Sequence, residues 1–218
     1  MHPSATVWIR RMGVLGLFSM ISYTLAVLVA PAAYPGYDWL AQAVSDLSAA
    51  NAPSRELWNR LASLYDVCGL TVLMLCCVYV QGKLNRPLRI GVYAFTAMRW
   101  VSAIGYAYFP LTDSGFAGSF QDVMHMVVTA MVVVLSIVSL VLTMIGGFRK
   151  RALPALAVCA SIALCLMFGG SIGIGIAPPS LFGLFERFSV FSAVCYTAVL
   201  GVFLMLGFPN RVPEADAA

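Results

Sequence analysis

Charged side chains are scarce in this sequence of 218 residues: only 10% are Asp, Glu, Lys or Arg, whereas 61% are hydrophobic. A soluble domain has about a quarter charged residues and about half apolar ones. A chain this short has a large surface for its volume, so this composition excludes an ordinary soluble domain. The mean hydropathy of +0.90 points instead to an integral membrane protein.

Metal-binding residues and catalytic motifs are also lacking. The chain has two histidines, His2 and His125, which excludes a bis-histidine haem and a multi-histidine zinc site within one chain. The six cysteines lie in apolar runs without a CxxC pair, so no disulfide framework is expected. No GxSxG, HExxH or Walker motif names a reaction. We predict no cofactor; a mixed metal site of His125 and carboxylates is the alternative.

Six apolar runs have the length of about 20 residues that a membrane crossing needs. Their bounds are near 12–33, 57–81, 88–110, 122–147, 153–177 and 184–208. We predict an all-α integral membrane protein whose single domain, residues 1–218, is a bundle of six transmembrane helices. The first run resembles a secretory signal, but it is longer than a typical signal core, and we expect an uncleaved helix.

The connection from Pro35 to Ser54 is the longest between two runs. Trp39-Leu40, Ala43-Val44 and Leu47 follow a helical spacing, which predicts a short amphipathic helix at the outer interface. Such a helix is a lid over the bundle or, alternatively, part of a re-entrant segment.

Lys and Arg fall in alternate connections, and the remaining connections are acidic. Arg10 and Arg11 precede the first run, and Arg149-Lys150-Arg151 lie between the fourth and the fifth. Cytoplasmic loops carry the Lys and Arg excess, so both termini are expected in the cytoplasm. The basic residues form no cluster on one solvated face, so we expect no nucleic-acid partner.

Two charges lie well inside predicted spans. Asp66 is ten residues after Glu56, or about 15 Å along a helix, and Arg99 lies eleven residues before Pro110 at a similar depth. Because a charge in the bilayer is costly, we predict an Asp66–Arg99 ion pair. It either pins two helices together, with help from neighbours such as Tyr65 and Thr96, or relays protons or ions.

A second polar cluster is predicted at the outer end of the bundle. His125, Glu186 and Asp46 have side chains suited to handling protons, and Arg60, Arg187 and Asp113 to binding a headgroup. Each also has a structural interpretation as a loop charge or a hydrogen-bonded residue. For Asp122 we prefer the structural one, because Ser119 three residues earlier completes a capping-box pattern.

Small residues are concentrated in the fifth run, as Gly169-Gly170-Ser171-Ile172-Gly173. This spacing lets two helix backbones approach closely. A glycine-lined pore is the alternative.

Several short motifs occur together in a recognisable order. They are Tyr34-Pro35-Gly36-Tyr37-Asp38, Val44-Ser45-Asp46-Leu47-Ser48-Ala49, Tyr108-Phe109-Pro110-Leu111-Thr112-Asp113, His125 and Gly183-Leu184-Phe185-Glu186-Arg187. The chain thereby resembles the bacterial and archaeal membrane family numbered 998 among domains of unknown function. Ser48 departs from the glycine of that pattern. The resemblance implies a prokaryotic cytoplasmic membrane and supplies no mechanism.

A weaker resemblance is to the Frag/DRAM/Sfk-type membrane proteins, which are associated with lipid remodelling. From the residues, the leading hypothesis is a protein that binds or processes a lipid or amphipathic molecule in an outer polar pocket. One alternative is a small proton- or ion-coupled transporter, or a subunit of one, that uses Asp66 and Arg99. The other is an assembly partner without a ligand. Expected partners are membrane lipid and a second membrane protein or copy of the chain.

Overall fold

The computed structural model describes residues 3–115 and 117–209, and these residues form helices and loops without a strand. The N-terminal helices are α1 (Pro3–Arg11), η1 (Met12–Val14), α2 (Leu15–Val29) and η2 (Ala30–Ala33), where η denotes a 3-10 helix. They are followed by η3 (Ser45–Ser48), α3 (Arg55–Leu61), α4 (Ser63–Val80) and α5 (Arg86–Tyr108). The last are α6 (Phe120–Phe148), η4 (Arg149–Arg151), α7 (Pro154–Ile176), η5 (Pro179–Leu181) and α8 (Phe182–Leu206).

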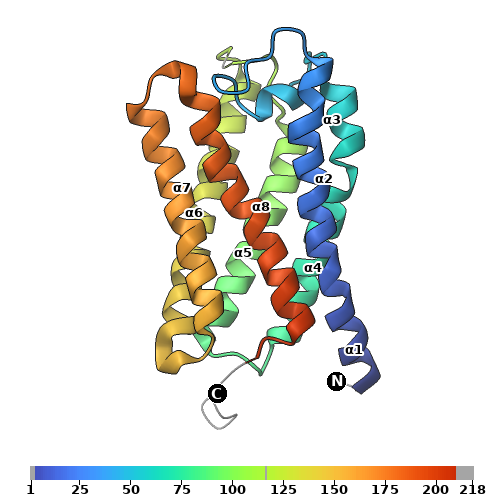
Figure 1. Ribbon diagram of the computed structural model, residues 1–218, viewed down its shortest axis with the longest axis vertical. Coiled ribbons are helices and arrows are strands. Elements are labelled where there is room, and N and C mark those ends of the chain that lie inside the picture. The colour runs from blue at the N-terminus through green and yellow to red at the C-terminus, as the bar shows by residue number, and fades with distance from the viewer. Residues whose placement is uncertain (1–2, 116, 210–218) are drawn as a thin grey trace.

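The long helices pack side by side in a closed ring (Figure 1). Going round it, α2 contacts α4, α4 contacts α5, α5 contacts α6, α6 contacts α7 and α7 contacts α8, which returns to α2. We call one end of the bundle the rim; it holds the connections 34–54, 109–119 and 177–181 (Figure 1). The opposite end, the base, holds α1 and the connections 81–85 and 149–153 (Figure 1).

Five helical segments of the described chain are long and apolar enough to cross a membrane. They are Ser4–Ala33, Arg55–Val80, Phe120–Arg151, Pro154–Ile176 and Pro179–Leu206. This confirms the all-α class and indicates a multi-pass membrane protein. The predicted third span, α5, is not among the five, because it is less apolar and carries Arg86, Arg89 and Arg99.

The base half of the ring is filled by apolar side chains. Phe95 packs edge-on against Tyr196, with ring centroids 4.9 Å apart. Around them, side chains from α4, α5, α6, α7 and α8 are almost fully buried, among them Val72, Leu73, Cys76, Leu88, Val92, Leu140, Leu156 and Leu200. Close packing of this kind leaves few voids larger than a water molecule.

Small residues bring α7 and α8 together. A Cβ atom at Gly170 would lie 2.5 Å from the carbonyl oxygen of Phe185, and one at Gly173 would overlap the Phe185 ring. These two glycines therefore serve helix packing, as predicted from their spacing. A Cβ at Gly169 would meet nothing within 4 Å, so that glycine faces away from the contact.

The helix that carries Asp66 bends between α3 and α4, at Ala62. The bend changes the hydrogen-bond pattern, and serine hydroxyls of α2 donate to backbone carbonyl groups beside it. Ser22 donates to Leu61 O at 2.5 Å and Ser19 to Tyr65 O at 2.7 Å. These bonds satisfy backbone acceptors that would otherwise be costly inside a membrane.

The predicted amphipathic helix in the first rim connection is not confirmed. Described residues 34–54 contain turns and the 3-10 helix η3. The Asp38 carboxylate accepts from the backbone N–H groups of Leu40 and Ala41, and Tyr37 donates to Ala43 O at 2.7 Å. Such local side-chain bonds compete with helical bonds, which the apolar spacing alone does not reveal.

Candidate functional site

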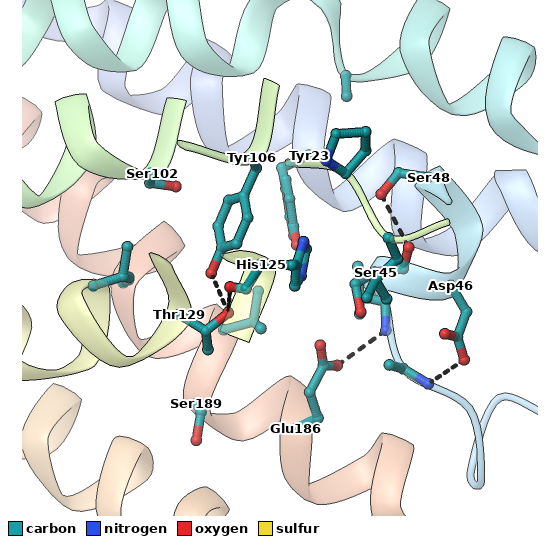
Figure 2. Close-up of a pocket in the computed structure, with 18 of the residues that line it drawn as sticks. Tyr23, Ser45, Asp46, Ser48, Ser102, Tyr106, His125, Thr129, Glu186 and Ser189 are labelled. Carbon is teal, nitrogen blue, oxygen red and sulfur yellow. Dashed lines mark hydrogen bonds between the residues drawn. The ribbon is translucent and has the colours of Figure 1, made fainter. Parts of the chain in front are cut away.

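The rim half of the ring contains an open cavity of about 900 Å³ (Figure 2). Its walls come from every long helix of the ring and from the two longer rim connections. Small side chains are frequent there and leave the space open, among them Ala62, Ser102, Ala103, Ala107, Ser171, Ser189 and Ala193. The charged and titratable lining groups, apart from tyrosines, are Asp46, Arg55, Asp66, Arg99, His125 and Glu186.

His125 lies in the first turns of α6 and faces this cavity (Figure 2). Its Nδ1 lies 2.8 Å from Phe109 O. A carbonyl oxygen only accepts, so Nδ1 carries the proton and the neutral ring keeps a lone pair on Nε2. The imidazole lies beside the ring of Tyr106, at 4.7 Å between centroids, and the Tyr106 hydroxyl is 3.0 Å from Thr129 Oγ1. His125 is therefore held in one orientation, and its Nε2 remains able to accept a hydrogen bond.

Glu186 and Asp46 differ in what their carboxylates do. One oxygen of Glu186 accepts from the Val44 backbone N–H at 3.1 Å, and the other has no hydrogen bond within the described chain. Asp46 is buried, and its two oxygens accept from the N–H groups of Ala43 (3.1 Å) and Gly115 (3.0 Å). Asp46 thus joins the two rim connections, whereas Glu186 keeps a free oxygen beside the cavity.

Asp66 and Arg99 form the deepest polar group of the cavity. Arg99 Nη2 lies 3.0 Å from Asp66 Oδ1, and Nη1 donates to the Tyr65 hydroxyl at 2.5 Å. The guanidinium group is almost fully buried, but the Asp66 side chain is 49% exposed. Of the neighbours expected to help, Tyr65 contacts the pair, whereas Thr96 donates to Val92 O and Ser63 is exposed. Asp66 Oδ2 therefore remains available on the cavity side.

The three residues predicted to bind a headgroup do not line the cavity. Arg60 forms an exposed pair with Glu56, one turn earlier on α3. Asp113 is exposed and accepts from the neighbouring Ser114 N–H at 2.7 Å. Arg187 is buried, yet it points into the first rim connection.

Arg187 fastens that connection to α8. It donates to Gln42 O at 3.0 Å and to the Tyr37 hydroxyl at 2.6 Å, and its guanidinium lies 4.2 Å from the centroid of the Trp39 ring. Burial raises the pKa of Tyr37 to about 12, although the Arg187 charge opposes the shift. The phenol is thus neutral at physiological pH. The contacts of Arg187 hold the loop; its Nε is buried without a partner in the described chain, and the side chain does not line the cavity.

Asp122 has the structural role expected from its spacing. It forms a capping box with Ser119 at the start of α6 and also accepts from the Thr112 N–H at 2.9 Å. Its carboxylate therefore fixes the second rim connection above His125.

Sequence reasoning missed the aromatic and hydroxyl groups of the cavity wall. Tyr23, Ser102, Tyr106 and Thr129 were not assigned to the candidate site, yet all four line the cavity (Figure 2). A usable signal exists for Thr129, because it follows His125 by four residues and therefore lies on the same face of α6.

The chemistry available here is binding and proton transfer. The described residues contain no group of three or more His, Cys, Asp or Glu side chains placed to hold a metal ion. The His125 Nε2, the free Glu186 oxygen and Asp66 Oδ2 are all able to accept a hydrogen bond or a proton. The remaining wall is apolar and suits a hydrocarbon group.

Comparison with known proteins places the chain in a family. The family model "Protein of unknown function (DUF998)" matches residues 17–203, and the chain belongs to this family. No curated protein and no solved structure matches it.

Proposed function

We propose that this member of the DUF998 family binds a lipid or other amphipathic molecule in the rim cavity. The observation that carries the proposal is the cavity itself, about 900 Å³ inside a ring of apolar helices. Ligand sites are typically clefts of about 300–1,000 Å³ with mostly apolar walls and a few placed polar groups. A structural partner without a ligand would gain nothing from such a space, because voids cost packing energy.

The proposal includes a sixth membrane span and an orientation. Helix α5 has 23 residues and is about 34 Å long, enough for a hydrocarbon core of about 30 Å. Its Arg99 is buried and paired, so this charge is not presented to lipid tails. The Lys and Arg residues of 83–89 and 149–151 lie at the base, which supports an orientation with the base in the cytoplasm and the rim outside. The proposed membrane is the inner membrane of a prokaryote.

The walls suggest how an amphiphile lies in the cavity. Met98, Val132 and Val133 offer apolar surface in its deeper part. His125 and Glu186 offer hydrogen-bonding groups near the rim, where polar groups reach water at lower cost. If the bound molecule is also processed, His125 Nε2 and the free Glu186 oxygen are the groups to accept a proton.

A transport route through the Asp66–Arg99 pair has less support. On the base side of the pair, the buried apolar cluster fills the ring, with Val72, Leu73 and Phe95 each fully buried. A proton or ion relay needs polar groups along its path. The pair therefore fits the closed end of a binding cavity better than the middle of a channel.

Native mass spectrometry of the gently extracted protein tests binding. We expect the wild type to retain an amphiphile that Ala103→Phe, whose new ring fills the cavity, has lost. The matched control is Ile104→Phe, one position along α5, where the side chain is 50% exposed and does not line the cavity. Equal ligand retention by both folded variants, or none in the wild type, would overturn the proposal.

A further inference from the structure

The basic and the acidic side chains that line the cavity differ in how many of their polar atoms have hydrogen-bond partners in the protein. On the basic side, Arg55 lies exposed at the rim and donates to Ala50 O at 3.0 Å, and Arg99 donates to Tyr65 and Asp66. On the acidic side, Glu186 and Asp66 each have one carboxylate oxygen without a hydrogen bond in the described chain. Both cations thus donate to protein acceptors, although the buried Arg99 Nε has no partner in the described chain, while two anions keep unused acceptor atoms.

His125 adds a third acceptor. Because Nδ1 donates to Phe109 O, its Nε2 presents a lone pair, and the side chain belongs to a residue only 8% exposed. Nε2 is not one of the fully buried atoms that lack a partner in the described chain, so it is open to the cavity. In Figure 2 the imidazole and the Glu186 carboxylate both border the same open space. The unpaired atoms of these two side chains accept hydrogen bonds, so they suit a ligand group that donates them.

The arginines that would favour an anionic headgroup are directed elsewhere. Arg187 is engaged with the Gln42 carbonyl and the Tyr37 hydroxyl, and Arg60 is paired with Glu56 outside the cavity. A phosphate or carboxylate placed beside Glu186 would face further acceptor atoms without a clamping guanidinium. A cation there would supply a countercharge to a carboxylate that is held partly out of water.

We infer that the rim cavity selects amphiphiles whose polar group is cationic and donates hydrogen bonds, such as an alkylammonium, over anionic ones. This inference rests on the proposed binding function. Glu186 and His125 are assigned as the residues that contact the ammonium group, and the alkyl chain lies against the apolar wall. A ligand long enough to reach the deep end of the cavity donates a second hydrogen bond to Asp66.

Three probes with the same chain and different heads test the selection: tetradecylamine, tetradecanol and tetradecanoic acid. Their binding is measured by equilibrium filtration of the protein in zwitterionic nanodiscs. Retention by the Ala103→Phe variant gives the baseline for partition into lipid. We expect the amine to bind at least about tenfold more tightly than the acid, since only the amine donates a charge-assisted hydrogen bond to the cavity acceptors.

Single substitutions show which carboxylate causes the preference for the amine. Glu186→Gln retains an oxygen that can accept from the Val44 N–H, so the rim connection keeps its anchor, and the variant is expected to lose most of the amine preference. Glu56→Gln removes a carboxylate outside the cavity and should leave the preference unchanged. Asp66→Asn keeps an oxygen that can accept from Arg99, and it tests whether the Asp66 carboxylate also contributes to the amine preference.

The outcomes separate the two proposals. If the acid binds as tightly as the amine or more so, or if Glu186→Gln keeps the full preference, the selection is wrong while cavity binding stands. If none of the probes exceeds the Ala103→Phe baseline, both the selection and the proposed binding function are overturned.

Discussion

The two halves of the helix ring are built from the same kind of apolar sequence and differ in what fills them. In the base half, large side chains such as Phe95, Leu88 and Leu200 meet at the centre and are fully buried. In the rim half, the positions facing inward often hold Ala or Ser, as at Ala103 and Ser102, and a cavity remains. The size of inward-facing side chains, more than hydropathy, separates a packed core from a binding space.

The largest contrast is expected when apolar bulk is removed from each half. Phe95→Ala should lower the free energy of unfolding by about 3 kcal/mol, because it empties a packed site. Val133→Ala borders an existing cavity and should cost less than about 1 kcal/mol. Unfolding in mixed micelles with increasing SDS measures both. Equal losses would show that the rim half is as tightly packed as the base half.

Breaking the ion pair at the border between the halves should have the next largest effect. Asp66→Leu leaves the buried Arg99 charge unpaired, and we expect a loss of about 2–3 kcal/mol. This is at the low end for a buried pair because Asp66 is half exposed. Arg60→Ala, which removes an exposed pair, should change stability by less than about 1 kcal/mol. A similar small change for Asp66→Leu would contradict burial of the Arg99 charge.

Two adjacent glycines of α7 test the packing of the rim half's outer wall. Gly170→Ala places a methyl group against the Phe185 carbonyl and should destabilise the protein by about 1–3 kcal/mol. Gly169→Ala meets open space and should stabilise it by up to about 1 kcal/mol through helix propensity. Melting temperatures of the two purified variants relative to wild type check the signs. Equal shifts of the same sign would reject this α7–α8 contact.

The smallest effect is expected in the rim connection itself. Tyr37→Phe removes the hydroxyl that donates to Ala43 O and accepts from Arg187, a loss of about 1–2 kcal/mol confined to this loop. Hydrogen exchange should quicken at residues 40–47 while protection at Phe95 in the base half is unchanged. Faster exchange in both halves would mean that loop and core are coupled.

Contacts between neighbouring antiparallel helices were accessible from the sequence. Asp66 and Arg99 lie equally far from the connection 81–85, and depth counting brought them together. The Ser119–Asp122 capping box was predictable for a similar reason, because it depends on residues three positions apart. Both cases need only helix geometry and a short loop.

The orientation of Arg187 could not be read in this way. It follows Glu186 directly on α8, and the same depth suggested a joint site. Successive residues of a helix point about 100° apart, so Glu186 borders the cavity while Arg187 reaches Gln42 and Tyr37 in a connection far away in the sequence. Which face of α8 meets that connection depends on how the ring closes.

Composition and periodicity by themselves determined that this chain is a helical membrane protein, where the apolar helices after the first begin and end, and which charges share a depth. These properties follow from local rules of helix length, desolvation and charge placement. Only the tertiary structure decided that the rim half is hollow, that Glu186 and His125 face the cavity and that Arg60 and Arg187 do not. The reason is that a cavity and its free acceptors arise from side chains of many helices at once, and no single helix specifies them.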